Sequence, residues 1–84
     1  MLREDLPASE KILQILHNLC AIAPDLARRS EELASFLQMD KSEVERILEE
    51  YGYEGYVESY ANHEGNKCYY LTGKGIIKVC ALFT

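Results

Sequence analysis

The side chains best suited to metal binding or nucleophilic chemistry are three cysteines and two histidines, and they are widely separated. None has a second cysteine or histidine at the short spacing of a zinc site, and no nucleophile–base pair or phosphate-binding loop is present. We therefore expect no metal site, no cofactor and no enzyme activity. The five residues are His17, Cys20, His63, Cys68 and Cys80.

The cysteines also indicate the cellular compartment in which the protein is expected to be found. Their odd number, without a signal peptide, predicts a reducing and cytoplasmic location. Each lies among apolar neighbours, so we expect all three to be small core residues. The longest apolar run, 79–83, is far shorter than the ~20 residues that cross a bilayer, so no membrane association is expected.

Charge limits the partners that this chain can bind. The 84 residues carry nine lysines and arginines against fourteen acidic residues, a net charge of −5. This excludes a generic polycation for nucleic acid, so any contact with DNA must use a local patch. Residues 40–58 hold seven acidic and two basic residues, whereas residues 59–84 hold three lysines and one glutamate.

Helical periodicity fills the first two thirds of the sequence. We expect helices from Ser9 to near Ile22, from Ser30 to Gln38 or Met39, and over 40–52, the last ended by Gly52 or Gly55. Ser9 and Ser30 are the expected N-caps of the first two, and Asp40 with Glu43 forms a capping-box pair for the third. In the link before Ser30, Leu26 is expected to be buried.

The pattern changes after the third helix. Two runs rich in tyrosine and β-branched residues, 56–61 and 68–72, flank an Asn- and Gly-containing segment, which predicts a β-hairpin over 56–72. Tyr69 and Leu71 are expected on its core face, opposite Val57, Ser59 and Ala61. A last helix is expected over 75–83.

This element order predicts a mostly helical α+β fold of the winged helix-turn-helix plan: a three-helix core, a hairpin wing and a C-terminal helix. The wing must lie against the helices, because two strands alone are marginally stable. We expect one domain over residues 1–84, with residues 1–8 as an N-terminal arm.

Two stretches carry a resemblance to a known family. Residues 39–58 read MDKSEVERILEEYGYEGYVE, and residues 69–75 read YYLTGKG. They resemble the recognition-helix segment and the wing exit of winged-helix transcription regulators of the multiple-antibiotic-resistance-repressor kind. The resemblance extends over residues 9–84. It implies a DNA-binding transcription regulator in which helix 40–52 is the recognition helix and hairpin 56–72 is the wing.

The resemblance also implies where double-stranded DNA would be met. Helix three would present a hydroxyl for phosphate and an arginine that can fork onto guanine, and the polar wing tip would meet the flanking groove or backbone. Glu43 and Glu45 depart from the family pattern, in which small hydroxyl residues are common. By position, the resemblance places Lys41, Ser42, Glu43 and Arg46 at the DNA. From their charge and hydrogen-bonding groups we add as expected contacts Arg28, Arg29, Asn62, His63, Asn66, Lys67 and Lys74, with a plain hairpin turn as the alternative for the wing tip.

Several alternatives stay open at this point. Winged helices also serve as protein-binding modules, and the acidic helix three would then suit a basic protein partner. Arg28 and Arg29 are either a phosphate clamp or surface charge that offsets Glu31 and Glu32. The six tyrosines are interpreted as core and rim residues rather than as base-stacking residues.

The last helix is apolar almost all round, with Lys78 as its polar exception. Such a helix leaves an exposed patch on a small protein unless something covers it. A two-fold partner is the simplest cover and predicts a homodimer; the alternative is cover by helix one and the N-terminal arm within the monomer. The expected interface residues are Ile76, Val79, Cys80, Leu82 and Phe83.

Overall fold

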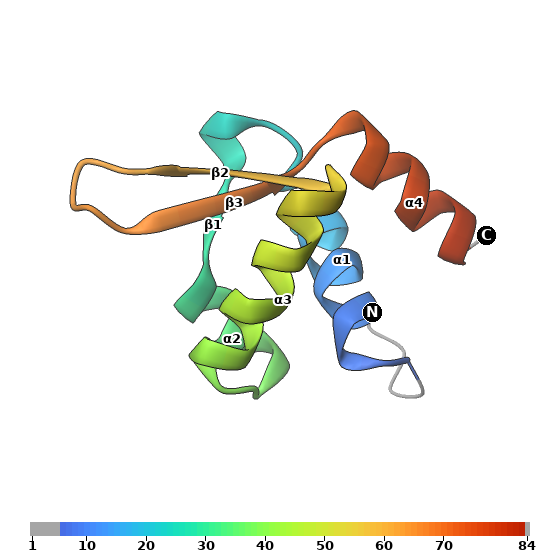
Figure 1. Cartoon of the computed structure of the whole chain (residues 1–84), viewed down its shortest axis with the longest axis horizontal. Helices are drawn as coiled ribbons and strands as arrows, with labels where there is room; N and C mark the ends of the chain where they lie inside the picture. Colours follow the sequence, from blue (N-terminus) through green and yellow to red (C-terminus); the bar gives the residue numbers. More distant parts are fainter. Residues whose placement is uncertain (1–5, 84) are drawn as a thin grey trace.

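The computed structural model describes residues 6–83, with every side chain in that range except that of Phe83. The chain order is helix, short 3-10 turn, short strand, two helices, hairpin and helix (Figure 1). The expected arm lies mostly outside the described residues, and Ala8 is already helical. The elements are α1 Ala8–Asn18, η1 Pro24–Leu26, β1 Arg28–Arg29, α2 Ser30–Leu37, α3 Lys41–Glu54, β2 Val57–Ala61, β3 Lys67–Leu71 and α4 Gly73–Phe83.

The hairpin is confirmed, but it belongs to a three-stranded antiparallel sheet in the order β1-β3-β2. Val57 pairs with Leu71, and Ala61 pairs with Lys67 at the far end. Strand β1, expected as part of an irregular link, pairs Arg28 with Tyr69 on the other edge of β3. Two residues give no alternation pattern, so the sequence carries no strand signal there.

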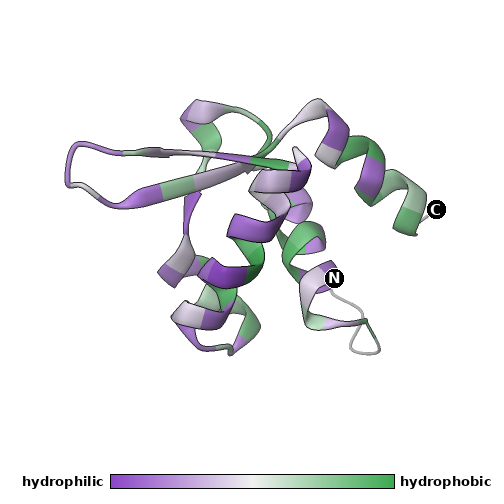
Figure 2. Cartoon of the chain, in the orientation of Figure 1, coloured by the Kyte–Doolittle hydropathy of each residue, from purple (hydrophilic) through white to green (hydrophobic). Residues whose placement is uncertain are grey.

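The apolar core lies where α1, α2 and α3 meet the inner face of the hairpin. Ile12 and Leu16 of α1, Leu33 of α2, Val44 of α3 and Leu71 of β3 have no exposed surface. The hairpin tip, by contrast, projects from the body and is hydrophilic (Figure 2). Of the expected inward residues of β2, Val57 alone is buried, and Ser59 and Ala61 are exposed because β2 is an edge strand of the sheet.

Helix α1 ends at Asn18, four residues before the expected end. Cys20 adopts a left-handed conformation with φ 58°, and the Ala21 amide donates to the Leu16 carbonyl. This is a Schellman closure with cysteine where glycine is usual. Ser9 is not its cap, because the helix begins at Ala8 after Pro7.

Three other expectations about burial and capping are wrong. Cys20 and Cys80 are exposed and Cys68 is buried, so one of three cysteines is a core residue. Leu26 is 46% exposed, because η1 holds it on the surface. Ser30 lies inside α2, whose N-cap is Arg29.

The residues on either side of the wing explain where α3 ends and where α4 begins. Helix α3 continues past Gly52 to Glu54, and Gly55, the second of the two expected ends, closes it with φ 84°. Helix α4 begins at Gly73, two residues early, because the Thr72 hydroxyl oxygen accepts the Gly75 amide at 3.0 Å and caps its first turn. The same hydroxyl donates to the Gly55 carbonyl at 2.6 Å, which ties the two junctions together.

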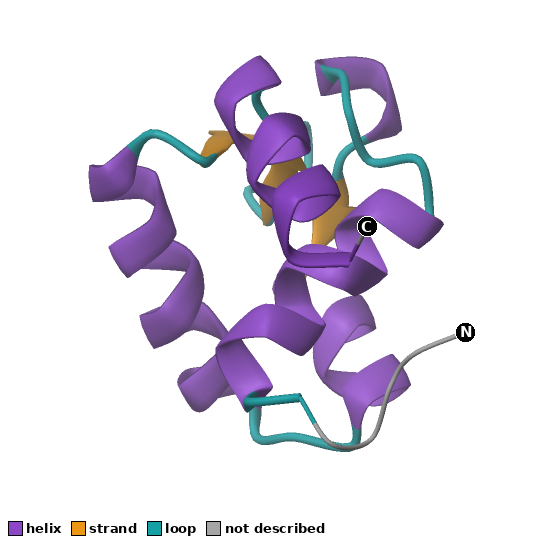
Figure 3. Cartoon of the chain, turned by 90° about the vertical axis from the view of Figure 1, so that its right-hand side faces the viewer, coloured by secondary structure: helices purple, strands orange, loops and turns teal. Residues whose placement is uncertain are grey.

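Three packed helices followed by a hairpin and a further helix form the winged helix-turn-helix arrangement, which confirms the predicted α+β fold. Seen from the side, helices fill most of the molecule and the strands lie behind them (Figure 3). Within residues 6–83, no helix has both the length and the apolar character needed to cross a membrane.

Candidate nucleic-acid interface

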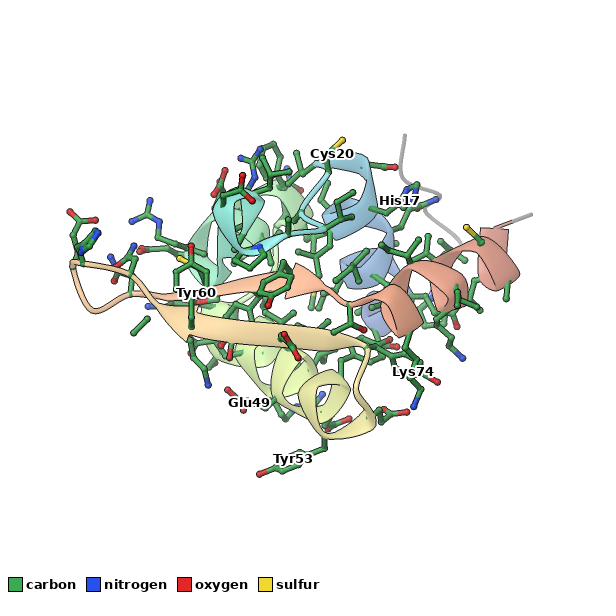
Figure 4. The ribbon with its side chains drawn as sticks, turned by 90° about the horizontal axis from the view of Figure 1, so that it is seen from above. His17, Cys20, Glu49, Tyr53, Tyr60 and Lys74 are labelled. Atoms are coloured by element: carbon green, nitrogen blue, oxygen red, sulfur yellow. The ribbon has the colours of Figure 1, made fainter. Side chains whose placement is uncertain are left out.

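The outer face of α3 lies below the hairpin in the view from above, and Glu49 and Tyr53 extend from it (Figure 4). Lys41 and Ser42 occupy its first turn and are exposed, as the resemblance implies. Tyr53, near its last turn, is 91% exposed. Asp40 precedes the helix without a side-chain capping bond, so the expected capping box with Glu43 does not form.

Glu43 is engaged elsewhere on its own helix. Its Oε1 accepts a hydrogen bond from Arg46 Nη2 at 2.7 Å, and its Oε2 accepts one from Arg46 Nε at 3.3 Å. Arg46 Nη1 donates to Glu50 Oε1 at 2.6 Å. The guanidinium beside Glu43 lowers the pKa of that carboxyl, and the carboxylate in turn raises the pKa of Arg46. Each of the three guanidinium nitrogens of Arg46 therefore donates one hydrogen bond to a carboxylate one turn away, and Glu43 takes the Nε and Nη2 edge.

Glutamate also engages the expected wing lysine. Lys67, the first residue of β3, places its Nζ 2.5 Å from Glu49 Oε1 on α3. The same ammonium lies 5.8 Å from the centre of the Tyr69 ring. Burial, followed by the charges of Glu49 and Glu45, raises the pKa of Tyr69 to about 12. The ion pair ties the tip-side end of β3 to the middle of α3.

An asparagine side chain holds the wing tip together. The Asn62 Oδ1 accepts the amides of Glu64 and Asn66 at 2.9 and 3.0 Å, and Gly65 takes φ 83° in the turn. His63 is exposed, whereas Asn62 and Asn66 are half-buried. Of these three expected wing-tip contacts, His63 thus has the most open position, and the Asn62 carbonyl oxygen already serves the turn.

Arg28 and Arg29 lie in β1 and reach the acidic first turn of α2. Arg28 Nη1 is 2.6 Å from Glu32 Oε2, and Arg29 Nη1 is 3.6 Å from Glu31 Oε1. The geometry matches the interpretation in which these arginines offset the two glutamates. Both side chains keep about a third or more of their surface exposed, at 35% and 44%.

Lys74 lies at the opposite end of α3 from Lys41. Its Nζ donates to the Glu54 carbonyl at 2.7 Å and lies 5.0 Å from the centre of the Tyr56 ring. A cation at a helix C-terminus is favourable because the last carbonyls carry partial negative charge. Lys74 therefore caps α3, a role that the sequence did not indicate.

The basic residues among the expected DNA contacts are thus mostly paired within the chain. Arg28, Arg29, Arg46 and Lys67 each have a glutamate partner. Within residues 6–83, Lys41 forms no ion pair. The (i, i−3) and (i, i+4) spacing of Glu43 and Glu50 around Arg46 could have revealed those pairs from the sequence. The 18-residue separation of Glu49 and Lys67 carries no such signal.

The expected dimer residues of α4 are divided between two faces. Val79 is buried in the core of its own chain, whereas Ile76 and Leu82 are partly buried and pack against that core. Cys80 is exposed, and the side chain of Phe83 lies outside the described part. Ile77, which was not among the expected residues, is 71% exposed.

No family model matches the sequence, and no curated protein matches it either. Solved structures do resemble the fold. A candidate DNA-binding protein from Ralstonia eutropha superposes with a TM-score of 0.80 at 20% identity, over 94% of this chain and 98% of that one. MepR of Staphylococcus aureus, a transcription regulator of the multidrug efflux pump MepA, gives 0.76 at 20% identity, over 92% of this chain and 55% of MepR.

A variant of MarR from E. coli, complexed with operator DNA, gives a TM-score of 0.74 at 22% identity. That match covers 92% of this chain and 53% of the MarR chain. The chain therefore spans about half the length of MepR and MarR. At these identities the comparisons establish the winged helix-turn-helix fold that the sequence predicted.

Proposed function

We propose that this chain is the DNA-binding part of a transcription regulator, with α3 as its recognition helix and the β2–β3 hairpin as its wing. The observation that carries the proposal is the match of nearly the whole chain to regulators of this fold, one of them complexed with operator DNA. The exposed first turn of α3 gives further support, because helix-turn-helix proteins read bases with the N-terminal residues of that helix.

In this proposal the contacts divide by chemistry. Lys41 and Ser42 meet phosphate or base edges at the start of α3, and Arg46 lies one turn further along the helix. Lys67 and His63 meet the backbone beside the wing. Arg28 and Arg29 are available as phosphate contacts only if their glutamate partners release them.

We further propose a homodimer through the exposed side of α4. Ile77 and Cys80 form the outer part of this helix, and Ile76 and Leu82 lie at its edge. The support is physical: an exposed isoleucine beside partly buried apolar neighbours is better covered by apolar surface than by water. Val79 has no part in this contact because its own core buries it.

One observation favours a second candidate, a protein-binding winged helix. The face formed by α3 and the tip-side end of β3 carries Glu43, Glu49 and Glu50 against Arg46 and Lys67, so its formal charge is −1 before Lys41 is added. An acidic or neutral face suits a basic protein partner better than a polyanion.

A salt-dependent duplex titration separates the two candidates. Fluorescence anisotropy of a labelled, mixed-sequence duplex should show saturable binding at low salt that weakens as salt rises. Lys41→Ala should weaken it, whereas Lys11→Ala, on α1 and outside the proposed contact, is the matched removal of one positive charge. An absence of binding by the intact chain at low salt would contradict the DNA-binding proposal.

A further inference from the structure

The basic residues on the α3 and wing face are bound by glutamates of α3 itself. Arg46 is bound by Glu43 on one side and Glu50 on the other, and Lys67 is bound by Glu49. The arginine uses Nε, Nη1 and Nη2 in these bonds. The Nε and Nη2 edge that Glu43 occupies is one of the two edges with which a guanidinium forks onto a phosphate or a guanine.

We propose that Glu43 and Glu50 act as built-in competitors of DNA for the guanidinium of Arg46, so that DNA must displace Glu43 before it can bind the Nε and Nη2 edge. This inference rests on the proposed DNA-binding function and names a regulation of that same site. A carboxylate offers two anionic oxygens to a guanidinium, as a phosphate does. Glu43 therefore occupies the arginine in the way that the DNA backbone would.

The pairs are exposed enough to exchange. The side chains of Arg46, Glu43 and Glu50 keep 56%, 46% and 62% of their surface accessible to water. Exposed ion pairs of this kind contribute little to stability, so phosphate can displace them. The need to displace the glutamates nevertheless lowers the affinity for DNA. The hydrogen bonds from Arg46 to the glutamates are broken, and the freed carboxylates then lie beside the phosphates.

The competition has a consequence for discrimination between sites. A contact with phosphate alone exchanges one charged partner of Arg46 for another and gains little. A base edge that offers two acceptors, as guanine does, adds directional bonds to the same exchange. The glutamates therefore lower binding to random duplex more than binding to a site with a guanine under Arg46.

The test is a double-mutant cycle on duplex binding with the intact chain. Glu43→Gln keeps the shape of the side chain and removes its charge. It should raise affinity for a random duplex by about two- to fivefold, the range that corresponds to one exposed ion pair. Glu54→Gln is the matched control, since it removes the same charge from the same helix without an ion-pair partner among the described residues.

The decisive arm repeats Glu43→Gln in an Arg46→Ala background. If Glu43 acts by holding Arg46, the increase in duplex affinity caused by Glu43→Gln should fall to that caused by Glu54→Gln once the arginine is absent. A gain that persists without Arg46 would mean that Glu43 simply repels DNA, and would overturn the inference while leaving the DNA-binding proposal intact. Failure of every variant, including Glu43→Gln, to bind any duplex at low salt would overturn both. Circular dichroism confirms that each variant is folded.

Discussion

Ser30 Oγ donates a hydrogen bond to Glu45 Oε2 at 2.8 Å, which joins the first residue of α2 to the second turn of α3. Ser30 is 4% exposed and Glu45 is half-buried. The bond therefore holds the two helices of the helix-turn-helix at a point far from the turn that connects them. Its loss would loosen the angle at which α3 is presented.

Ser30→Ala should lower the free energy of unfolding by about 1–2 kcal/mol, because it removes a partly buried hydrogen bond to a charged group while Glu45 keeps access to water. Urea denaturation measures the change. Ser35→Ala, an exposed serine on the same helix, is the control and should change stability by less than about 0.5 kcal/mol. Equal effects of the two substitutions would show that the interhelical bond contributes nothing.

Gly75 and Gly73 should respond to alanine in opposite ways. A Cβ at Gly75 would overlap the Tyr56 carbonyl oxygen and lie 3.1 Å from Leu71 Cδ2, whereas one at Gly73 meets nothing within 4 Å. Gly75→Ala should therefore destabilise the fold by about 1–3 kcal/mol. Gly73→Ala should leave stability unchanged or raise it by up to about 1 kcal/mol. Thermal unfolding of the pair, compared with the unchanged protein, tests this close approach of α4 to the segment that follows α3.

Stability should fall in alkali through Tyr69. Its pKa in the folded chain is about 12, above the ordinary value of 10.0, because burial and nearby carboxylates disfavour the phenolate. The folded state thus binds this proton more tightly than the unfolded state does. The contribution is complete below about pH 10 and is lost as pH rises from about 10 through about 12.

Urea midpoints measured across that pH range give the slope of stability against pH. Tyr69→Phe should flatten it, although Tyr51 and Tyr70, whose pKa values are also raised, keep part of the dependence. Tyr53→Phe removes an exposed phenol and is the matched control. An unchanged slope in Tyr69→Phe would contradict the prediction.

A charge on the outer side of α4 should prevent the proposed dimer. Ile77→Glu places a carboxylate at the most exposed apolar position of that helix, so it should give monomers in sedimentation at concentrations where the unchanged chain associates. Leu82→Glu tests the edge of the same face. Phe36→Glu is the control, because it places the same charge at an exposed apolar residue of α2, outside the proposed contact, and should leave association unchanged. A monomeric unchanged chain would contradict the proposed dimer.

The salt dependence of duplex binding should report which bases touch phosphate. Lys41→Ala and Lys67→Ala should each reduce the slope of log affinity against log salt by about 0.9, the value for one phosphate that is no longer neutralised. Lys67→Ala should weaken all sequences alike, whereas Arg46→Ala should also relax base preference at one position by about 1–3 kcal/mol. Lys74→Ala removes the side chain that caps the C-terminal end of α3. Its effect on duplex binding shows how much affinity is lost when α3 is weakened, for comparison with the loss in Lys41→Ala and Lys67→Ala.

Most of the fold could be predicted from the sequence because its signals are local. The apolar spacing in α1 and α3 and the Asn- and Gly-containing turn of the hairpin each act over a few residues. Strand β1 could not be predicted, since two arginines become a strand only when β3 is already beside them. The left-handed Cys20 was equally hidden, because cysteine gives no sign of the closure that glycine would indicate.

The candidate interface was less accessible to sequence reasoning. The positions of Lys41, Ser42 and Arg46 on α3 follow from helical spacing, and the structure keeps them exposed. Whether a base is available depends on its partners, and Lys67 acquires Glu49 through the packing of the wing on α3. Lys74 likewise became a helix cap through a contact 20 residues away.

The short strand β1 gives the wing a mechanical connection to the helix-turn-helix. It is hydrogen-bonded to β3 at Arg28 and Arg29, and it passes without a break into α2 at Ser30. A force that bends the hairpin therefore pulls on the first residue of α2 as well as on the end of α3. Because β2 begins just after α3 ends, the sheet is joined along the chain to both helices of the helix-turn-helix, to α2 through β1 and to α3 through β2.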